Sequence, residues 1–303
     1  MQNEPTRYEL NIGKTSKIPS VWKGVFCIVL SAFFYSLMSL FVRMSGDLPV
    51  YQKSFFRNLV AALVAFILLV KSKNFKIQKG SLPALLGRSI AGTVGIVCNF
   101  YAIDHMNISD ANMLNKLSPF FAIILSIPIL REKANKIEWG AVILAFIGAM
   151  FVAKPSFDLA GIPAFAGFLG GLGAGTAYTF VRLLGKRGER GNVIIFFFST
   201  FSCIAVLPFM LGGYQPMSAY QLGCLLLAGC AATGGQVFIT KAYTYAPAKE
   251  ISVFDYSQVI FAAVLGFLFL DQMPDMWSVL GYFIIIAAAA GKWYYNIKQE
   301  TAQ

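Results

Sequence analysis

The stretch from Ala91 to Leu130 reads AGTVGIVCNFYAIDHMNISDANMLNKLSPFFAIILSIPIL. A second stretch, from Ala231 to Leu270, reads AATGGQVFITKAYTYAPAKEISVFDYSQVIFAAVLGFLFL and aligns with the first at an offset of 140 residues without a gap. Nine of the 40 positions are identical, where shared apolar composition alone gives roughly three or four. The identities in the first copy are Ala91, Thr93, Gly95, Val97, Ala102, Phe121, Ala122, Leu125 and Leu130. The chain is therefore predicted to contain an internal repeat, with parallel drift of two unrelated apolar halves as the competing interpretation.

The composition places this repeat in a lipid bilayer. Of the 303 residues, 57% are hydrophobic and 13% are charged, which is too apolar for a soluble globular protein. A soluble enzyme, a nucleic-acid-binding protein and a disulfide scaffold are thereby excluded. The five cysteines form no CxxC pair, so they predict neither a zinc site nor a redox pair, and no cofactor is expected.

Ten apolar runs are long enough to cross a membrane as helices. They lie at about 22–44, 50–70, 81–103, 109–129, 136–153, 160–183, 192–211, 218–240, 248–270 and 275–296. The first is too long for a signal-peptide core, so it is predicted to be a retained span. The predicted fold is an all-α membrane protein of ten transmembrane helices, divided into a polar tail (1–20), two five-helix repeats (21–156 and 157–297) and a short tail (298–303). Because five is odd, the second repeat is inserted upside down.

The charges orient the chain. The formal net charge is +11, and 19 of the 25 Lys and Arg residues fall on one side of the ten spans, against three, Lys53 among them, on the other. Basic loops stay in the cytoplasm. The sequence therefore predicts a multi-pass protein of the cytoplasmic membrane with both termini in the cytoplasm.

Four ionisable residues fall well inside the predicted spans: Arg57, Arg88, Lys116 and Asp255. A charge at mid-bilayer costs about 2.5 to 3.5 kcal/mol or more, so each needs a partner or a wet cavity. Their surplus of about two positive charges favours an anionic or zwitterionic solute. The alternative interpretations are a structural role for Arg57 near the outer face beside Asp47, and snorkelling of Arg88 to the cytoplasmic membrane surface.

The repeat aligns two polar lines. Asn112, Asn115 and Ser118 in the fourth span correspond to Ser252, Asp255 and Gln258 in the ninth, at i, i+3 and i+6 in both copies. Equivalent polar faces on an inverted pair are expected to line a central cavity. Bonding between helices is the alternative.

Particular roles follow for single residues. Asp255 is the candidate carrier if transport is coupled to protons, and a fixed salt bridge to Lys116 is the competing role. Tyr35 and Tyr256 are candidate contacts for the solute. Pro119 removes a backbone donor beside Lys116 and is expected to kink the fourth span. The single histidine, His105, has no nucleophile or metal partner in the sequence, so no catalytic residue and no metal ligand is predicted.

Small residues spaced by four predict helix contacts, because helices in lipid pack where their backbones can approach closely. There are three such stripes: Gly167, Gly171 and Gly175; Gly87, Ala91 and Gly95; and Ala141, Ala145 and Ala149. Gly95 and Gly235 are expected to let the bundles close on each other.

Taken together, these features resemble the ten-span EamA-type members of the drug/metabolite transporter superfamily, over about residues 22–293. The motifs behind the resemblance are Phe55-Phe56-Arg57, Tyr101-Ala102, Ser118-Pro119-Phe120-Phe121, Arg131-Glu132-Lys133 and Asp271-Gln272. The resemblance implies a secondary transporter working by alternating access, with a cavity lined chiefly by spans 1, 3, 4, 6, 8 and 9. The first span lacks the membrane Glu of the four-span multidrug exporters of that superfamily, which argues against their mechanism here.

The predicted function is transport of a small polar metabolite, anionic or zwitterionic, such as an amino acid, an amino-acid derivative or an organic acid. The alternatives are a flippase for a lipid-linked phosphate, and an exporter of nucleotide-like metabolites or drugs. A membrane-embedded enzyme is disfavoured because one isolated His and one deep Asp do not make a catalytic cluster. The expected partners are a small-molecule substrate and membrane lipid, without nucleic acid, and the sequence indicates no oligomeric state.

Overall fold

The computed structural model describes residues 17–72, 77–131, 135–153, 161–245 and 251–301, and these are helical apart from short turns. Most of the predicted tail 1–20 and the motif residues Glu132 and Lys133 lie outside these ranges. The helices are α1 (Lys17–Met44), α2 (Val50–Ser72), α3 (Leu82–His105), α4 (Ile108–Asn115), α5 (Ser118–Leu130), α6 (Lys136–Ala153), α7 (Ile162–Lys186), α8 (Gly191–Gly212), α9 (Ala219–Tyr245), η2 (Ser252–Tyr256), α11 (Ser257–Leu270) and α12 (Met276–Thr301). Ten stretches of the described chain are long and apolar enough to cross a membrane, which confirms the predicted number of spans.

Two of the ten spans are broken, and they break at equivalent positions of the two repeats. The fourth span stops at Asn115 and resumes as α5 at Ser118, while the ninth changes from the 3₁₀ helix η2 to α11 after Tyr256. In the fourth span, Pro119 lacks the N–H that would continue the helix across the break, as the sequence predicts. The two resumed helices also end alike, because Arg131 and Asp271, 140 residues apart, both adopt left-handed backbone with φ of 56° and 52°.

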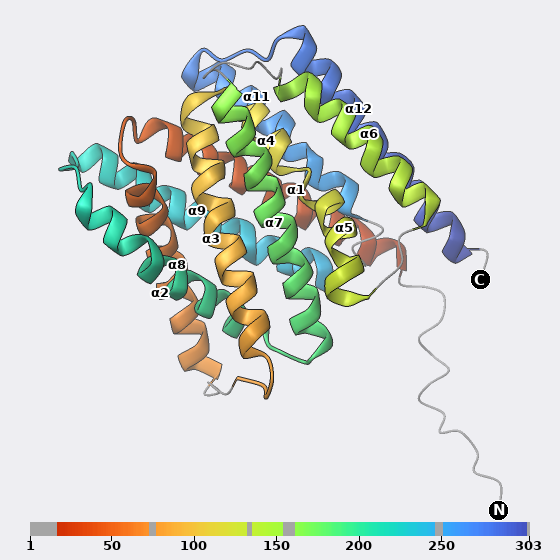
Figure 1. The fold of residues 1–303 in the computed structure, drawn as a ribbon, viewed down its shortest axis with the longest axis horizontal. Helices are drawn as coiled ribbons and strands as arrows, with labels where there is room; N and C mark the ends of the chain where they lie inside the picture. The colour runs from red at the N-terminus through yellow and green to blue at the C-terminus, as the bar shows by residue number, and fades with distance from the viewer. Residues whose placement is uncertain (1–16, 73–76, 132–134, 154–160, 246–250, 302–303) are drawn as a thin grey trace, which may run out of the picture.

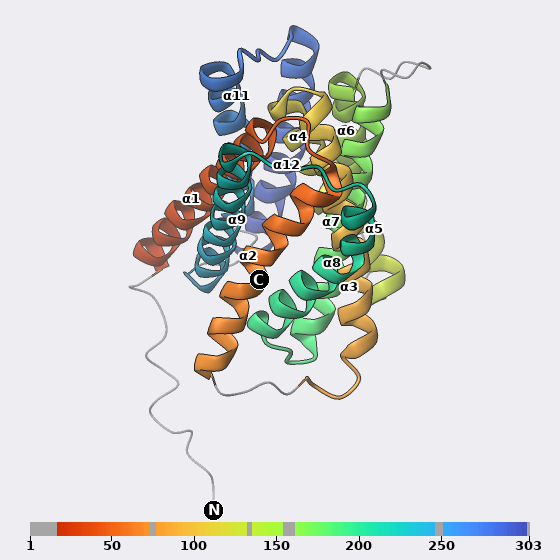
Figure 2. The same cartoon turned by 90° about the vertical axis from the view of Figure 1, so that its left-hand side faces the viewer.

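The helix contacts repeat in the same two-fold pattern (Figure 1). Helix α3 packs along α7, and its counterpart α9 packs along α1, which Figure 2 shows side by side. Helices α6 and α12 are counterparts that pack on each other, as do α2 and α8. A rotation that exchanges the first five spans with the last five therefore preserves the contacts, which confirms two inverted repeats.

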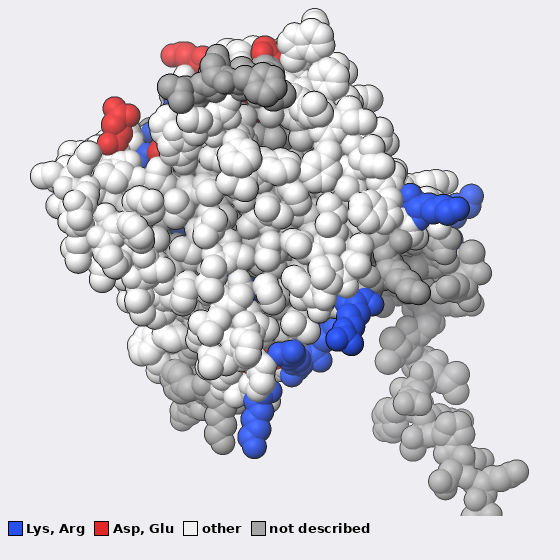
Figure 3. All heavy atoms as spheres, in the orientation of Figure 1, with Lys and Arg blue, Asp and Glu red and all other residues white. Residues whose placement is uncertain are grey.

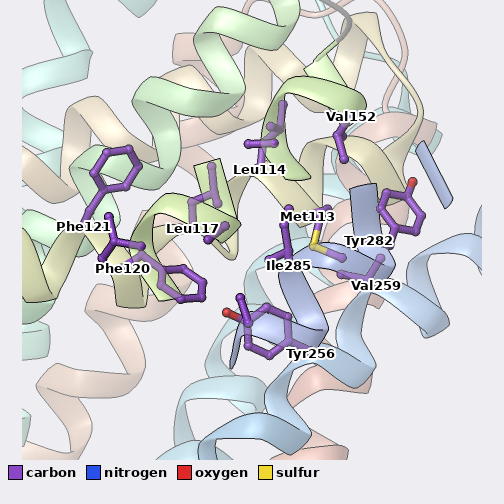
Figure 4. Close-up of a cluster of buried hydrophobic side chains, with 14 of the residues drawn as sticks. Met113, Leu114, Leu117, Phe120, Phe121, Val152, Tyr256, Val259, Tyr282 and Ile285 are labelled. Carbon is purple, nitrogen blue, oxygen red and sulfur yellow. The ribbon is translucent and has the colours of Figure 1, made fainter. Parts of the chain in front are cut away.

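The largest buried cluster ties the broken spans to the α6–α12 pair (Figure 4). Met113, Leu114 and Leu117 come from α4 and the break that follows it, and Tyr256 and Val259 come from the ninth span. Tyr282 and Ile285 of α12 close the cluster from the other side. The two breaks therefore rest on packed side chains that hold the turning backbone in place.

The predicted glycine stripe of α7 lies against the break in the fourth span. A Cβ added at Gly171 would lie 2.6 Å from the Leu114 carbonyl oxygen, and one at Gly175 would lie 2.6 Å from both the Ser118 carbonyl oxygen and Phe121 Cβ. On the α3 side, a Cβ at Gly95 would lie 3.1 Å from the backbone nitrogen of Ala174. The alanine stripe of α6 is buried in the cluster of Figure 4. All three stripes are therefore helix contacts, as predicted.

The two ends of the bundle differ in charge (Figure 3). Lys and Arg lie mainly along the lower and right-hand edges of the face in Figure 3, and Asp and Glu along its upper edge. We call the end that carries the turns 77–81 and 187–190 the basic end, after Lys79 and Arg187. The end that carries the turns 45–49 and 271–275 is the acidic end, after Asp47 and Asp271.

Candidate functional site

A cavity of about 410 Å³ lies between the two repeats. This volume falls within the range of about 300 to 1,000 Å³ that is usual for small-molecule sites. Its polar and charged lining residues are Tyr35, Arg57, Arg88, Asn99, Asn112, Asn115, Lys116, Tyr178, Asn192, Ser199, Thr233, Gln236, Lys241, Asp255 and Gln258. Helices α2 and α8, the second and seventh spans, contribute as well as the six spans that the resemblance implies.

The two broken spans place an ion pair in this cavity. Lys116 follows the last residue of α4, Asp255 lies in η2, and the Lys116 ammonium donates to Asp255 Oδ2. A cation is favoured at this position because the C-terminal end of a helix carries partial negative charge. The predicted pairing of Lys116 with Asp255 is thus present, and their side chains are 10% and 19% exposed.

Tyr256 supports this pair from outside the cavity. It is the repeat counterpart of Lys116, its ring is buried in the cluster of Figure 4, and its hydroxyl donates to the Lys116 carbonyl oxygen at 3.1 Å. Tyr256 does not line the cavity. Its position is that of a residue that fixes the backbone at the break, whereas the sequence suggests contact with the solute.

The two polar lines meet each other. Asn112 Oδ1 accepts hydrogen bonds from Gln258 Nε2 at 2.9 Å and from the Ser39 hydroxyl at 3.0 Å. Asn112, Asn115 and Gln258 also line the cavity, so bonding between helices and cavity lining occur together. Ser118 is buried but is not among the lining residues. The side chain of Ser252 lies outside the described part of the structure.

Arg57 and Arg88 both face the cavity. The Arg88 guanidinium stacks on the ring of Phe198, with its Cζ 3.5 Å from the ring centroid. The Arg57 Nη1 donates to Asn58 Oδ1 at 2.6 Å, and not to Asp47. These contacts match neither alternative interpretation, because Arg57 is not bonded to Asp47 and Arg88 points to the cavity rather than to the membrane surface.

Two tyrosines and a lysine complete the polar lining. The Tyr35 hydroxyl donates to Gln236 Oε1 at 3.1 Å, which places this predicted residue at the cavity wall. Tyr178 is 54% exposed although it lies inside the bundle, because its side chain borders the cavity. Lys241 adds a further positive charge. Among the described lining residues, four are basic and Asp255 alone is acidic.

The comparisons with known proteins agree with this architecture. A family model described as the EamA-like transporter family matches residues 22–154 and again residues 161–292. The chain belongs to this family.

Two relatives match nearly the whole length of this EamA-like transporter. The pseudopaline exporter CntI of Pseudomonas aeruginosa is 30% identical over 268 residues, which cover 88% of this chain and 94% of that protein. Human solute carrier family 35 member G1 is 28% identical, with coverage of 93% and 83%. A solved crystal structure shares the fold with a TM-score of 0.64 at 12% identity, over 91% of this chain and 98% of that one. The chain is therefore a multi-pass membrane transporter.

Further buried charges of this EamA-like transporter lie away from the cavity. Lys53, which is predicted on the less basic side of the spans, lies in the first turn of α2 at the acidic end. It is fully buried, and its ammonium lies 2.6 Å from Asp104 Oδ1 of α3. Asp110 of α4 is also buried, and the Tyr282 hydroxyl donates to its Oδ1 at 2.5 Å. His105 stacks on the ring of Tyr101 at the acidic end. Within the described ranges, no group of three His, Cys, Asp or Glu side chains is placed to hold a metal ion.

Proposed function

We propose that this EamA-like transporter carries a small anionic or zwitterionic metabolite through the cavity by alternating access. The observation behind the proposal is the charge of the lining: Arg57, Arg88, Lys116 and Lys241 face a single carboxylate, Asp255, among the described lining residues. Cationic groups that line a cavity with low-dielectric walls attract anionic solutes and repel cations. Amino acids, their derivatives and organic acids have the matching charge.

The shape of the cavity favours loading from the basic end. Gly191 and Asn192, at the start of α8, and Lys241, near the end of α9, belong to its lining. At the acidic end the helices are tied together instead, because Arg43 Nη1 donates to the Ile103 carbonyl oxygen and Gln52 Nε2 donates to that of Gln215. In this proposal, the structure is a state open towards the basic end.

The basic end is, in this proposal, the cytoplasmic one, because basic loops remain in the cytoplasm. Both termini then lie in the cytoplasm, and the solute enters the cavity from the cytoplasm. Importers and exporters both pass through a state open to the cytoplasm, so our proposal of export rests on the activity in the name of the Pseudomonas aeruginosa relative.

The first experiment is a thermal-shift screen of the purified full chain against a library of charged metabolites, since a ligand that binds only the folded state raises its apparent stability. Hits are then tested for counterflow in proteoliposomes. Arg88→Gln is expected to weaken the apparent affinity about 10- to 100-fold, while Lys79→Gln, an exposed lysine of the basic end, leaves it unchanged. Hits confined to apolar cations would overturn the proposal, and hits confined to lipid-linked phosphates would favour a flippase.

The role of Asp255 needs a separate assay. If it carries a proton, Asp255→Asn abolishes uphill accumulation and preserves solute exchange. If it serves as the fixed partner of Lys116, Asp255→Asn lowers expression and folded yield, because Lys116 keeps a buried charge without its counterion. The ion pair supports the second role.

A further inference from the structure

Polar atoms without a hydrogen-bond partner gather on the cavity wall. Among the described residues they include Arg57 Nε, Arg88 Nε and Nη1, Asn112 Nδ2 and Asp255 Oδ1, all of them shielded from solvent. Buried polar atoms in folded proteins almost always have a partner, so each exception calls for an explanation. Because these exceptions border one cavity, a bound ligand is the partner that would satisfy them.

The two arginines form the first group. The face of the Arg88 guanidinium is occupied by the Phe198 ring, and its Nε and Nη1 have no hydrogen-bond partner among the described residues. Gly92 makes this stack possible, since a Cβ there would lie 2.8 Å from Arg88 Nη1 and 2.8 Å from Phe198 Cε2. Arg57 lines the same cavity as Arg88, and its Nε also has no hydrogen-bond partner among the described residues. Guanidinium edges match the geometry of carboxylates and bind them through two parallel hydrogen bonds.

Asp255 forms the second group. Its Oδ2 accepts from the Lys116 ammonium, and its Oδ1 is buried without a partner among the described residues. An unpartnered carboxylate oxygen beside a cavity that is otherwise positive is matched by a donor that carries positive charge. A protonated amine of the ligand meets this requirement.

Both groups border one cavity. Arg57, Arg88 and Asp255 are among its lining residues, and the side chain of Tyr178, which also lines it, is 54% exposed. A single ligand in this cavity can therefore contact the arginines with one end and Asp255 with the other.

We propose that the ligand is an amino acid or amino-acid derivative with at least two carboxylates and one protonated amine. Its carboxylates bind the edges of Arg57 and Arg88, and its amine binds Asp255 Oδ1. This rests on the proposed function and names the substrate class for the same cavity.

Three matched probes test the two groups separately. Glutamate carries two carboxylates and an amine, glutarate lacks the amine, and 4-aminobutanoate lacks one carboxylate. Their dissociation constants are measured by isothermal titration calorimetry on the purified full chain. Glutamate is expected to bind about 10- to 100-fold more tightly than either of the other two, because each loses one charge-assisted contact.

The variants assign each contact to its residue. Asp255→Asn is expected to lower the affinity for glutamate to that for glutarate, and not to weaken the binding of glutarate. Arg88→Gln is expected to weaken glutamate and glutarate about 10- to 100-fold and to affect 4-aminobutanoate less. If Asp255→Asn fails to fold, the comparison of glutamate with glutarate on the unmodified protein still decides the question.

The outcomes separate this inference from the proposed function. Equal affinities for glutamate and glutarate would overturn the amine site. The same conclusion would follow if the protein binds other charged metabolites but none of the three probes. Either result would leave transport of an anionic solute standing. If only apolar cations bind, both the inference and the proposed function fail.

Discussion

Removing one partner of the Lys53–Asp104 ion pair should destabilise the protein strongly, whereas removing both should not. The Lys53 side chain is completely buried and that of Asp104 is 14% exposed, with 2.6 Å between Nζ and Oδ1. Breaking a buried pair costs about 3 to 5 kcal/mol because a buried charge loses its counterion. Asp104→Asn, which leaves the buried ammonium unpaired, is expected to cost that amount. Lys53→Met should cost no more than the lower part of the range, because Asp104 keeps some contact with solvent.

The double variant Lys53→Met/Asp104→Leu is the decisive member of the series. Replacing both charges by apolar side chains is often neutral or stabilising, so the double variant should be more stable than Asp104→Asn alone. The free energy of unfolding is measured in detergent by titration with sodium dodecyl sulfate and followed by circular dichroism. Lys79→Met, at an exposed position, should stay within about 0.5 kcal/mol of the unmodified protein. If the double variant is destabilised by the sum of the two single changes, the residues do not interact and the reasoning fails.

Two other pairs of variants test the packing. Gly175→Ala places a Cβ 2.6 Å from the Ser118 carbonyl oxygen, whereas Gly185→Ala on the same helix meets nothing within 4 Å. Because overpacking costs about 1 to 3 kcal/mol, Gly175→Ala should unfold more easily than Gly185→Ala by that amount in the same titration, and equal stabilities would contradict the close contact of α7 with the broken span. Tyr282→Phe removes a donor to the buried carboxylate of Asp110 and should cost about 1.5 to 3 kcal/mol, while Tyr294→Phe, at a residue 65% exposed, should cost little. An unchanged stability of Tyr282→Phe would show that Asp110 does not depend on this bond.

The topology and the central ion pair are predictable from the sequence because both depend on depth in the membrane. Hydropathy and the 140-residue repeat place Lys116 and Asp255 at matching depths, and the structure pairs them. The repeat also aligns the polar line that begins at Asn112 with the one that ends at Gln258, and the structure joins these two side chains by a hydrogen bond. These inferences need the length of each span and the spacing along it, and both can be counted in the sequence.

The direction in which a side chain points from its helix is harder to predict in a membrane, because lipid-facing and buried positions are both apolar. Tyr178 and Phe198 look like ordinary packing residues in such runs, yet both line the cavity. Tyr256 shows the reverse case. It follows Asp255 in the sequence, which suggests a place at the cavity, but its side chain points into the core. The pairing of Lys53 can be predicted from the sequence, because Asp104 lies at the same end of the neighbouring span and two opposite charges at one depth suggest an ion pair.

Thiol labelling inside the bundle tests directly whether the repeats enclose a water-filled chamber. The side chains of Tyr178 and Ile260 are 54% and 61% exposed, but Tyr178 borders the cavity whereas Ile260 lies on α11 outside it. Tyr178→Cys and Ile260→Cys are made in a chain whose five native cysteines are replaced, and each is treated with a charged, membrane-impermeant methanethiosulfonate, which reacts with the hydrated thiolate. We expect Tyr178→Cys to be modified far faster than Ile260→Cys, and glutamate to slow that reaction. Equal rates for the two variants would contradict the existence of the chamber.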